Sequence, residues 1–342
     1  MLGIEQKANK KSQVLIISLW ILAILTVLAV GIGHRVAMSL RMSRYQKDSL
    51  KAFYLAKAGV NLAIAEIEKD TTAAYDSPDE KWANNEELFR NITLTDNALE
   101  YASVSYTFLD ENNLPKTVYG AMDEERRINI NNAPSVLLAS LLGESGVSVT
   151  SGVVNNILIW RGDAQDTSKV YESLGYPPKA ADFTNTEELA LVKDMASDGP
   201  QEMRGLITVY GDKTNINTAP QEILKVIFHS QVSFLNSNNV NDVIAGDADT
   251  LAQKIIDCRR GGDGVEGNAD DVFFSDISRV AAAIELNEKE EKVLQQAIEN
   301  NLIGVQSKFI RIEAAGHAGN VTKKLTVVYD RAAKNIVSRH EF

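Results

Sequence analysis

The most pronounced hydrophobic pattern in the chain lies close to its start. Residues 14–32 are nineteen consecutive positions without a charged side chain. A hydrocarbon core about 30 Å thick needs roughly 20 predominantly apolar residues in a helix that rises about 1.5 Å per residue, so this stretch predicts one membrane span. The alternative is a cleaved secretory signal, which has a shorter apolar core and then a small-residue cleavage site. Residues 31–35 match such a site poorly, which favours a retained anchor.

Basic residues stand on both sides of this span. Lys7, Lys10 and Lys11 precede it, and arginines follow it at positions 35, 41 and 44. A large domain after a span can be translocated largely regardless of its charge. We therefore expect a short N-terminal stub in the cytoplasm and the bulk of the chain on the other side of the membrane.

Helical periodicity continues beyond the span. Apolar residues recur at mostly helical intervals, with charged residues between them; they are Val36, Leu40, Leu50, Phe53, Tyr54, Leu62, Ile64 and Ile67. The pattern predicts one helix from residue 14 to about residue 69, on the order of 80 Å long at 1.5 Å per residue. Its outer half should lie against another surface. Residues 75–78 should end it, because Pro78 is incompatible with a continuing helix.

Alternation with a period of two predicts the strands. Residues 101–108 alternate and are rich in aromatic and β-branched side chains. Three further candidates lie near the C-terminus, at residues 309–314, 325–329 and 335–338. The intervening stretch, about residues 129–305, is mostly helical in pattern. The economical interpretation is an α+β chain in which one sheet is interrupted by a helical insertion.

Two segments of the insertion resemble each other. Residues 127–138 and 214–224 both place an isoleucine–asparagine pair shortly before an Ala-Pro dipeptide and an apolar-periodic run. Asn132 and Thr218 are predicted helix N-caps, with proline two positions later in the first turn. Similar segments open helix-hairpin-helix modules that bind DNA phosphates, so a membrane-anchored DNA receptor is the alternative function. Residues 141–146 carry an acid where such modules usually carry lysines, and the formal net charge is −11, which opposes phosphate binding. We expect a structural repeat and no nucleic-acid partner.

Composition adds few candidates for chemistry. The 342 residues are 44% hydrophobic and 24% charged, as in ordinary globular proteins, and leave room for two domains after the anchor. Cys258 is the single cysteine and is predicted to be a half-buried structural thiol. The four histidines are scattered, and the sequence has no zinc, hydrolase, phosphate-loop or dinucleotide motif. The sequence therefore predicts no enzyme.

One glycine-rich loop, residues 258–271, is a candidate calcium site. Calcium takes six to eight oxygen ligands, and glycines let a short loop fold around it; the candidate ligands are Asp263, Glu266, Asn268, Asp270 and Asp271. The spacing is not that of an EF-hand, and a solvated acidic turn is the alternative. A second acidic turn, residues 160–166, is a weaker candidate, in which Trp160 is expected to close a helix against the core.

Five segments in order resemble the minor pseudopilin K family of the type II secretion system. They are residues 10–20, 52–63, 123–131, 185–195 and 213–224. The resemblance implies a pilin-like fold, with a long N-terminal helix packed on a small antiparallel sheet and a large all-helical domain inserted before the last strands. The implied divisions are a basic leader (1–12), a membrane-spanning part of the long helix (13–33), the first part of the pilin-like domain (34–128), the insertion (129–305) and the C-terminal strands (306–342).

The resemblance also implies processing and partners. Prepilin peptidase would cleave after a short basic leader, normally after glycine; here the bond lies between Ser12 and Gln13, and serine is small enough that we expect cleavage. The fifth residue after the cut is usually glutamate but is Ile17 here, which fits a subunit at the tip of the pseudopilus. The family further implies calcium in the helical domain, I- and J-type minor pseudopilins as partners, and an inner-membrane protein whose bulk lies in the periplasm.

Overall fold

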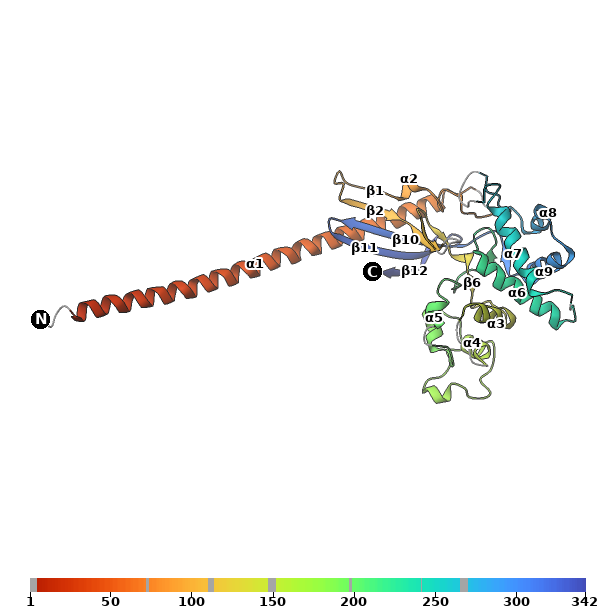
Figure 1. Cartoon of the computed structure of the whole chain (residues 1–342), viewed down its shortest axis with the longest axis horizontal. Coiled ribbons are helices and arrows are strands. Elements are labelled where there is room, and N and C mark those ends of the chain that lie inside the picture. Colours follow the sequence, from red (N-terminus) through yellow and green to blue (C-terminus); the bar gives the residue numbers. More distant parts are fainter. Residues whose placement is uncertain are drawn as a thin grey trace.

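A computed structural model describes residues 5–71, 74–109, 114–146, 152–196, 199–240, 242–264 and 270–342. Helix α1 (Glu5–Ile67) projects far beyond the remainder of the molecule (Figure 1). Its last part lies along an antiparallel sheet, and a group of shorter helices lies beyond the end of that sheet (Figure 1). The long helix, the sheet and the helical region thus follow one another along the molecule.

The sheet contains six strands in the described part of the chain, in the order β1-β2-β10-β11-β12, with β5 beside β10. The bounds are β1 (Ile92–Thr93), β2 (Glu100–Val104), β5 (Met122–Asp123), β10 (Phe309–Ala318), β11 (Val321–Asp330) and β12 (Asn335–Glu341). Val104 of β2 lies opposite Ala314 of β10, so the sheet joins strands from before and after the helical region. The predicted interrupted sheet is confirmed, and each C-terminal strand is longer than predicted.

The predicted strand at residues 101–108 is divided in two. β2 ends at Val104, and β3 (Tyr106–Leu109) pairs instead with β4 (Pro115–Val118) in a separate two-stranded sheet. The main-chain N–H of Ser105, between them, donates a hydrogen bond to the carbonyl of Glu313 (3.1 Å). Alternation continues through Ser105, and therefore it does not reveal that the chain changes sheets there.

The face of α1 that packs on the sheet is built mostly from small residues. Its fully buried positions are Ala52, Ala56, Val60, Ala63 and Ile67. Leu50 and Tyr54 of the predicted stripe are each 58% exposed, and only its last members lie against the core. The helix ends at Ile67, close to the predicted end near residue 69, and so the chain leaves the helix before it reaches Pro78. Its end coincides with contacts beyond the helix, because Tyr329 of β11 donates a hydrogen bond to Glu68 (2.7 Å) and Arg331 pairs with Asp70.

Side chains on the helix-facing side of β10 become smaller toward the strand's end. The alternating buried positions are Ile310, Ile312, Ala314, Gly316 and Ala318. A Cβ atom at Gly316 would lie 1.9 Å from the carbonyl oxygen of Ala52 and 2.5 Å from the amide nitrogen of Ala56. The backbone of α1 therefore approaches β10 closely enough that only glycine fits at this position.

The helical region has its own hydrophobic core, built from buried residues between Ile128 and Val305. A second core lies between α1 and the sheet. The helices are α2 (Glu86–Phe89), beside the sheet, and then α3 (Ser135–Glu144), α4 (Val153–Arg161), α5 (Gly199–Glu202), α6 (Gln221–Ser237), α7 (Ala245–Arg259), α8 (Val280–Ala283) and α9 (Glu288–Glu299). Short 3-10 helices span Glu124–Arg126, Glu172–Leu174, Thr186–Leu191 and Ile277–Arg279. Two short parallel pairs, which the sequence pattern did not predict, join β6 (Ile128–Asn129) to β7 (Ile207–Thr208) and β8 (Thr214–Asn215) to β9 (Ile303–Gly304).

The near-repeat in the sequence is a repeat in the structure. The side chain of Asn131 exchanges two hydrogen bonds with the main chain of Phe183 (3.0 and 2.8 Å), and Asn217 does the same with Phe274 (3.0 and 2.9 Å). An arginine at the end of the second helix of each unit donates to two carbonyls of the motif: Arg161 to Ile130 and Ala133, and Arg259 to Ile216 and Ala219. These asparagines and arginines hold a buried main-chain turn, which is a structural role.

The predicted N-caps of the two units are wrong by two residues. Pro134 and Pro220 occupy the N-cap positions of α3 and α6, and neither helix has a side-chain cap there. The two predicted caps are engaged elsewhere, since the Asn132 side chain donates a hydrogen bond to the carbonyl of Gly211 (3.1 Å) and the Thr218 hydroxyl donates one to Asp123 (2.5 Å). These contacts take the polar side chains that the prediction assigned to capping.

Candidate functional site

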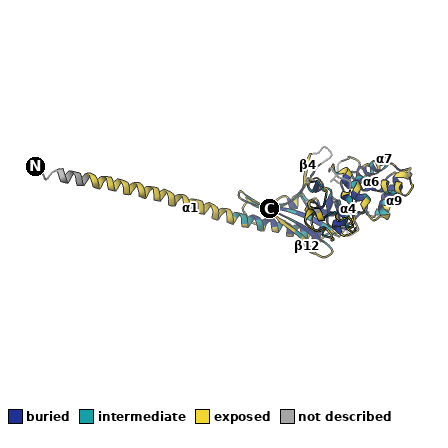
Figure 2. Ribbon diagram, turned by 90° about the horizontal axis from the view of Figure 1, so that it is seen from below, coloured by how far each residue is buried: buried dark blue, intermediate teal, exposed yellow. Residues whose placement is uncertain are grey.

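Helix α1 carries the residues predicted to matter for the membrane and for processing. One helix of the described chain, Ser12–Ile67, is long and apolar enough to cross a membrane. Most of its length is exposed, and only the part beside the sheet is buried (Figure 2). Ser12 and Gln13 lie inside the helix, and Ile17 is exposed in the apolar segment. The predicted single span is thus present as a projecting helix.

Large apolar side chains continue along α1 beyond the apolar segment. We define the exposed α1 face as four residues that are more than half exposed and share one side of the helix at 3.6 residues per turn: Val36, Leu40, Leu50 and Tyr54. The chain's own sheet covers the small residues on another side of the helix. Because contiguous exposed apolar surface marks interaction sites, this face is the candidate assembly surface.

A buried polar cluster joins the sheet to the helical region. Asp123 accepts hydrogen bonds from Asn215 (3.0 Å), Thr218 (2.5 Å) and Ser307 (2.7 Å), and also from the amide of Glu125 (2.8 Å). Burial nevertheless raises the pKa of the Asp123 carboxyl. Asn215 and Thr218 belong to the second repeat unit, so Asp123 fixes that unit to the end of the sheet.

Glu124 is the buried anion between two arginines. It is 1% exposed, pairs with Arg127 (2.5 Å) and with Arg311 of β10 (2.7 Å), and accepts a hydrogen bond from Thr208 (2.6 Å). Burial alone would raise its pKa, but the two guanidinium groups together hold the pKa of Glu124 below its usual range. The ionised carboxylate thus ties the sheet to the first repeat unit.

The carboxyls of Glu125 and Asp76, in contrast, have raised pKa values. Burial, with a further contribution from Asp123, raises the pKa of Glu125 to about 7, although one of its oxygens accepts hydrogen bonds from the amides of Lys308 and Phe309. Burial likewise raises the pKa of Asp76 to about 6 despite its pairing with Arg331. The sequence analysis identified Asp123–Arg127 only as part of a segment that resembles the family, and it did not predict this buried cluster. The feature that could have indicated it is the run of consecutive acids and arginines between apolar segments.

These raised pKa values predict a pH-dependent stability. Between the ordinary pKa of glutamate and the raised value of about 7 for Glu125, the folded state binds more protons than the unfolded state, so the free energy of unfolding falls as pH rises from about 4 to about 7 and then levels off. Glu125→Gln keeps the accepting oxygen and removes the charge. We expect this variant to raise the free energy of unfolding by about 2 kcal/mol at pH 8. This is less than the whole pKa shift would give at 1.36 kcal/mol per pKa unit.

Urea unfolding at pH 5 and pH 8 tests this expectation, with exposed Glu87→Gln as the control. The Glu125 variant should show a smaller difference between the two pH values, and the control should keep the original difference. Equal differences in both variants would contradict the assignment.

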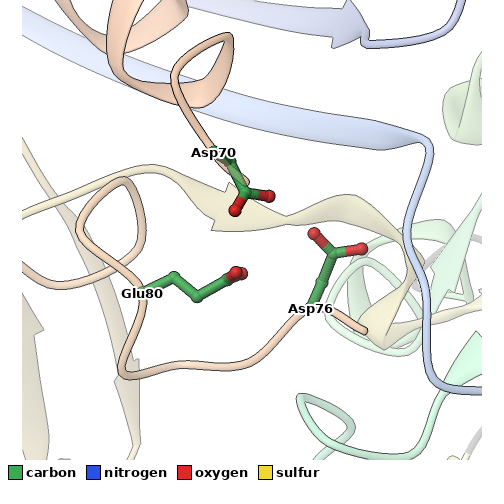
Figure 3. Close-up of side chains that lie close together, drawn as sticks. All are labelled: Asp70, Asp76 and Glu80. Atoms are coloured by element: carbon green, nitrogen blue, oxygen red, sulfur yellow. The ribbon is translucent and has the colours of Figure 1, made fainter. Parts of the chain in front are cut away.

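Asp70, Asp76 and Glu80 form a second acidic group that the sequence did not indicate. Their carboxylates point toward one another (Figure 3), and one oxygen from each lies within 4.8 Å of the others. Arg331 pairs with both Asp70 and Asp76, while Glu80 accepts hydrogen bonds from the Ser77 amide (3.2 Å) and the Trp82 indole (2.9 Å). These contacts explain the group as a turn that Arg331 holds against the end of the sheet.

The candidate calcium loop is described in part. Glu266 and Asn268 lie outside the described residues, whereas Asp263, Asp270 and Asp271 lie within them. Asp270 accepts hydrogen bonds from the amides of Gly262 (2.8 Å) and Asp263 (3.3 Å) across the loop. Gly261 has a φ of +65°, and a Cβ atom there would lie 2.3 Å from the carbonyl oxygen of Asp270. The glycines therefore let the loop fold closely over Asp270.

Cys258 and the second acidic turn have structural surroundings. Cys258 is partly buried as predicted, and burial raises the pKa of its thiol. Asp163 pairs with Arg161, and Asp166 accepts a hydrogen bond from the Val170 amide (2.6 Å). Trp160 is 5% exposed and belongs to the core of the helical region, as predicted.

Comparison with known proteins matches both parts of this architecture. The family model described as PilX N-terminal matches residues 13–61, which lie on α1. No curated protein matches the sequence. A chain from the crystal structure of the GspK-GspI-GspJ complex of the enterotoxigenic Escherichia coli type 2 secretion system is similar, with a TM-score of 0.61 and 13% sequence identity, over 88% of this chain and 99% of that chain. The likeness shows the fold, and the predicted pilin-like fold is confirmed.

Proposed function

We propose that this chain is a minor pseudopilin of a type II secretion system. The observation that carries the proposal is the likeness to a chain of the GspK-GspI-GspJ complex, because it extends over 88% of this chain and so includes the helical region as well as the sheet. The match of residues 13–61 to the PilX N-terminal family model supports the same assignment. In this proposal α1 anchors the chain in the inner membrane and the bulk of the chain lies in the periplasm.

The exposed α1 face is the proposed contact with other minor pseudopilins of the I and J types. The similar solved chain comes from a complex of GspK, GspI and GspJ. Leu50 and Tyr54 lie beside the sheet-packed segment of α1 but are each 58% exposed. A neighbouring helix would bury these two side chains. Their burial would stabilise the complex by about 25 cal/mol per Å² of apolar surface removed from water.

The proposed position is the tip of the pseudopilus, where this subunit would start assembly. Ile17 supports this position, because a glutamate there would need a cationic partner within the membrane, and an unpaired charge in hydrocarbon costs at least about 2.5 kcal/mol. The helical region supports it as well, since it lies beyond the end of the sheet and widens that end of the molecule (Figure 1). Prepilin peptidase would cleave between Ser12 and Gln13 before assembly.

Co-purification tests the function. Full-length chain in detergent should form a complex with I- and J-type minor pseudopilins encoded in the same genome. Leu50→Glu/Tyr54→Glu should abolish the complex, because it places two charges on the exposed α1 face. Leu99→Glu changes a residue that is 65% exposed outside α1 and should leave the complex intact. Failure of the unmodified chain to bind any such pseudopilin would overturn the proposal.

Calcium binding in the 258–271 loop is a proposed property of the same protein. Asp263, Asp270 and Asp271 would supply the hard oxygen ligands that calcium prefers, and the hydrogen bonds from the Gly262 and Asp263 amides to Asp270 hold the two described ends of the loop together. Bound calcium should raise the melting temperature of the full chain by a few degrees over a chelator, because a ligand of the folded state stabilises it by mass action. Asp271→Asn should remove this increase, and Asp182→Asn, at an exposed aspartate, should retain it. An unchanged melt would count against the site.

A further inference from the structure

A cavity of about 320 Å³ opens beneath the β3–β4 hairpin. Its volume lies at the lower end of the range for small-ligand pockets, about 300 to 1,000 Å³. Aromatic rings from three segments line it: Trp82 before α2, Tyr106 and Phe108 on β3, and Tyr119 after β4. Trp82 and Tyr106 are nearly buried and belong to the protein's packed interior. The cavity thus has aromatic rings in a wall that they share with polar side chains.

Arg126 brings an available positive charge to this wall. Its guanidinium lies 5.6 Å from the centre of the Phe108 ring. Within the described chain it makes no ion pair or hydrogen bond, although its neighbours Glu124 and Arg127 pair with each other and the whole chain is acidic. A half-buried guanidinium beside an aromatic ring is well placed to receive a planar carboxylate through two parallel hydrogen bonds.

The acids in the cavity wall are already neutralised or bonded. Glu86 pairs with Arg90 (2.5 Å), whose guanidinium lies over the Tyr119 ring. Asp123 accepts the hydroxyl of Thr218 and three further hydrogen bonds. With these acids engaged, Arg126 supplies the charge that favours an anionic guest at this wall, in contrast to the net charge of the chain.

Strand β4 gives the cavity a main-chain edge. Lys116, Thr117 and Val118 all line it, although consecutive side chains of a strand point to opposite faces. The cavity must then reach the backbone of β4 as well as one face of the hairpin. In the described part of the chain β4 pairs with β3 alone. An extended peptide can add to such an edge through main-chain hydrogen bonds while alternate side chains enter adjoining pockets.

We infer that this cavity binds an extended peptide that presents an aromatic side chain next to a carboxylate. The aromatic ring enters the cavity beside Phe108 and Tyr119. The carboxylate binds Arg126, and the peptide backbone lies along β4. This binding site is separate from the exposed α1 face, and its test does not depend on pseudopilin assembly.

Fluorescence anisotropy with a labelled peptide tests the inference. The probe is the peptide Gly-Phe-Asp-Gly-NH2 with a fluorophore on its N-terminal amine, titrated with full-length chain in detergent. Arg126→Gln should weaken binding about tenfold or more, because a hydrogen bond to a charged group contributes about 1.5–3 kcal/mol. Arg339→Gln is the matched control. Arg339 also lies over an aromatic ring, that of Phe53 at 5.5 Å, but on β12, and its loss should leave the affinity unchanged.

Changes in the peptide separate the parts of the inference. Replacing Asp by Asn should weaken binding of the probe as much as Arg126→Gln does, and should have little further effect in that variant. Replacing Phe by Ala should also weaken binding. No binding of the probe, or equal affinity for the Asp and Asn peptides, overturns the inference. If unlabelled N-acetylphenylalanine displaces the probe as well as the unlabelled peptide does, the site takes small carboxylic acids and the assignment to a peptide is wrong.

Discussion

Gly316→Val should unfold the sheet or detach it from α1. We expect the free energy of unfolding to fall by more than about 3 kcal/mol, which is above the usual range for overpacked cores. Valine favours strands over glycine intrinsically, so propensity predicts the opposite sign. The added Cβ would meet main-chain atoms of Ala52 and Ala56 at 1.9 and 2.5 Å. A helix backbone cannot move aside as the end of a flexible side chain can, and α1 must lift away from β10.

Two tryptophans allow this loss to be located. Trp82 belongs to the core between α1 and the sheet, and Trp160 belongs to the core of the helical region. Urea unfolding of full-length chain is followed in Trp20→Phe/Trp160→Phe and Trp20→Phe/Trp82→Phe backgrounds, each of which keeps one of the three tryptophans. The Gly316→Val effect should appear chiefly in the Trp82 signal. Ala315→Val, on the opposite face of the same strand, is the control and should change stability little. Equal stability of the two variants would contradict the close approach.

Glu124→Ala should destabilise both cores, by about 3–5 kcal/mol, the usual cost of removing one partner of a buried ion pair. Arg127, whose side chain is 8% exposed, would lose its anion and face Arg311 without compensation. Burial already lowers the pKa of Arg127 to about 10, and Glu124 is the main group that opposes this shift. The loss should therefore be larger than that of a surface pair.

The same two tryptophan backgrounds report on this variant. Because Glu124 joins β10 to the first repeat unit, both signals should move to lower urea concentration. Glu86→Ala is the control. It breaks an exposed pair with Arg90, and such pairs are worth about 0–1 kcal/mol. A shift confined to Trp82 would mean that the cluster does not connect the two parts of the molecule.

The sequence predicted the features whose cause is local. The apolar run at residues 14–32 is sufficient by composition to indicate a span, and alternation at residues 309–314 is sufficient to indicate a strand. The packed face of α1 was missed because Ala52, Ala56 and Ala63 carry little hydrophobic signal, although small side chains are what allow a close helix–sheet contact. The division at Ser105 was missed because its cause is a hydrogen bond to Glu313, far along the chain.

The candidate sites also divide into those that the local sequence indicates and those that depend on residues far apart in the sequence. The exposed α1 face was visible in the periodicity, as part of a stripe that was expected to lie against another surface. The roles of Asp123 and Glu124 depend on Thr208, Asn215, Ser307 and Arg311, which come from three separate parts of the sequence. No local pattern reports that these residues meet. The acidic loop was visible by composition, and its calcium affinity remains a prediction.

The pairing of β2 with β10 also constrains the order in which the chain can fold. Val104 and Ala314 lie opposite each other in the sheet. The whole helical region lies between them in the sequence, so it is synthesised after Val104 and before Ala314. Contacts of such high sequence separation pay the entropy of closing a long loop before they gain any energy. The helical region, whose buried core residues lie between Ile128 and Val305, can collapse first and shorten that loop. Until β10 and β11 are synthesised, the small-residue face of α1 has no complete sheet to cover it, so we expect completion of the sheet to be a late step of folding.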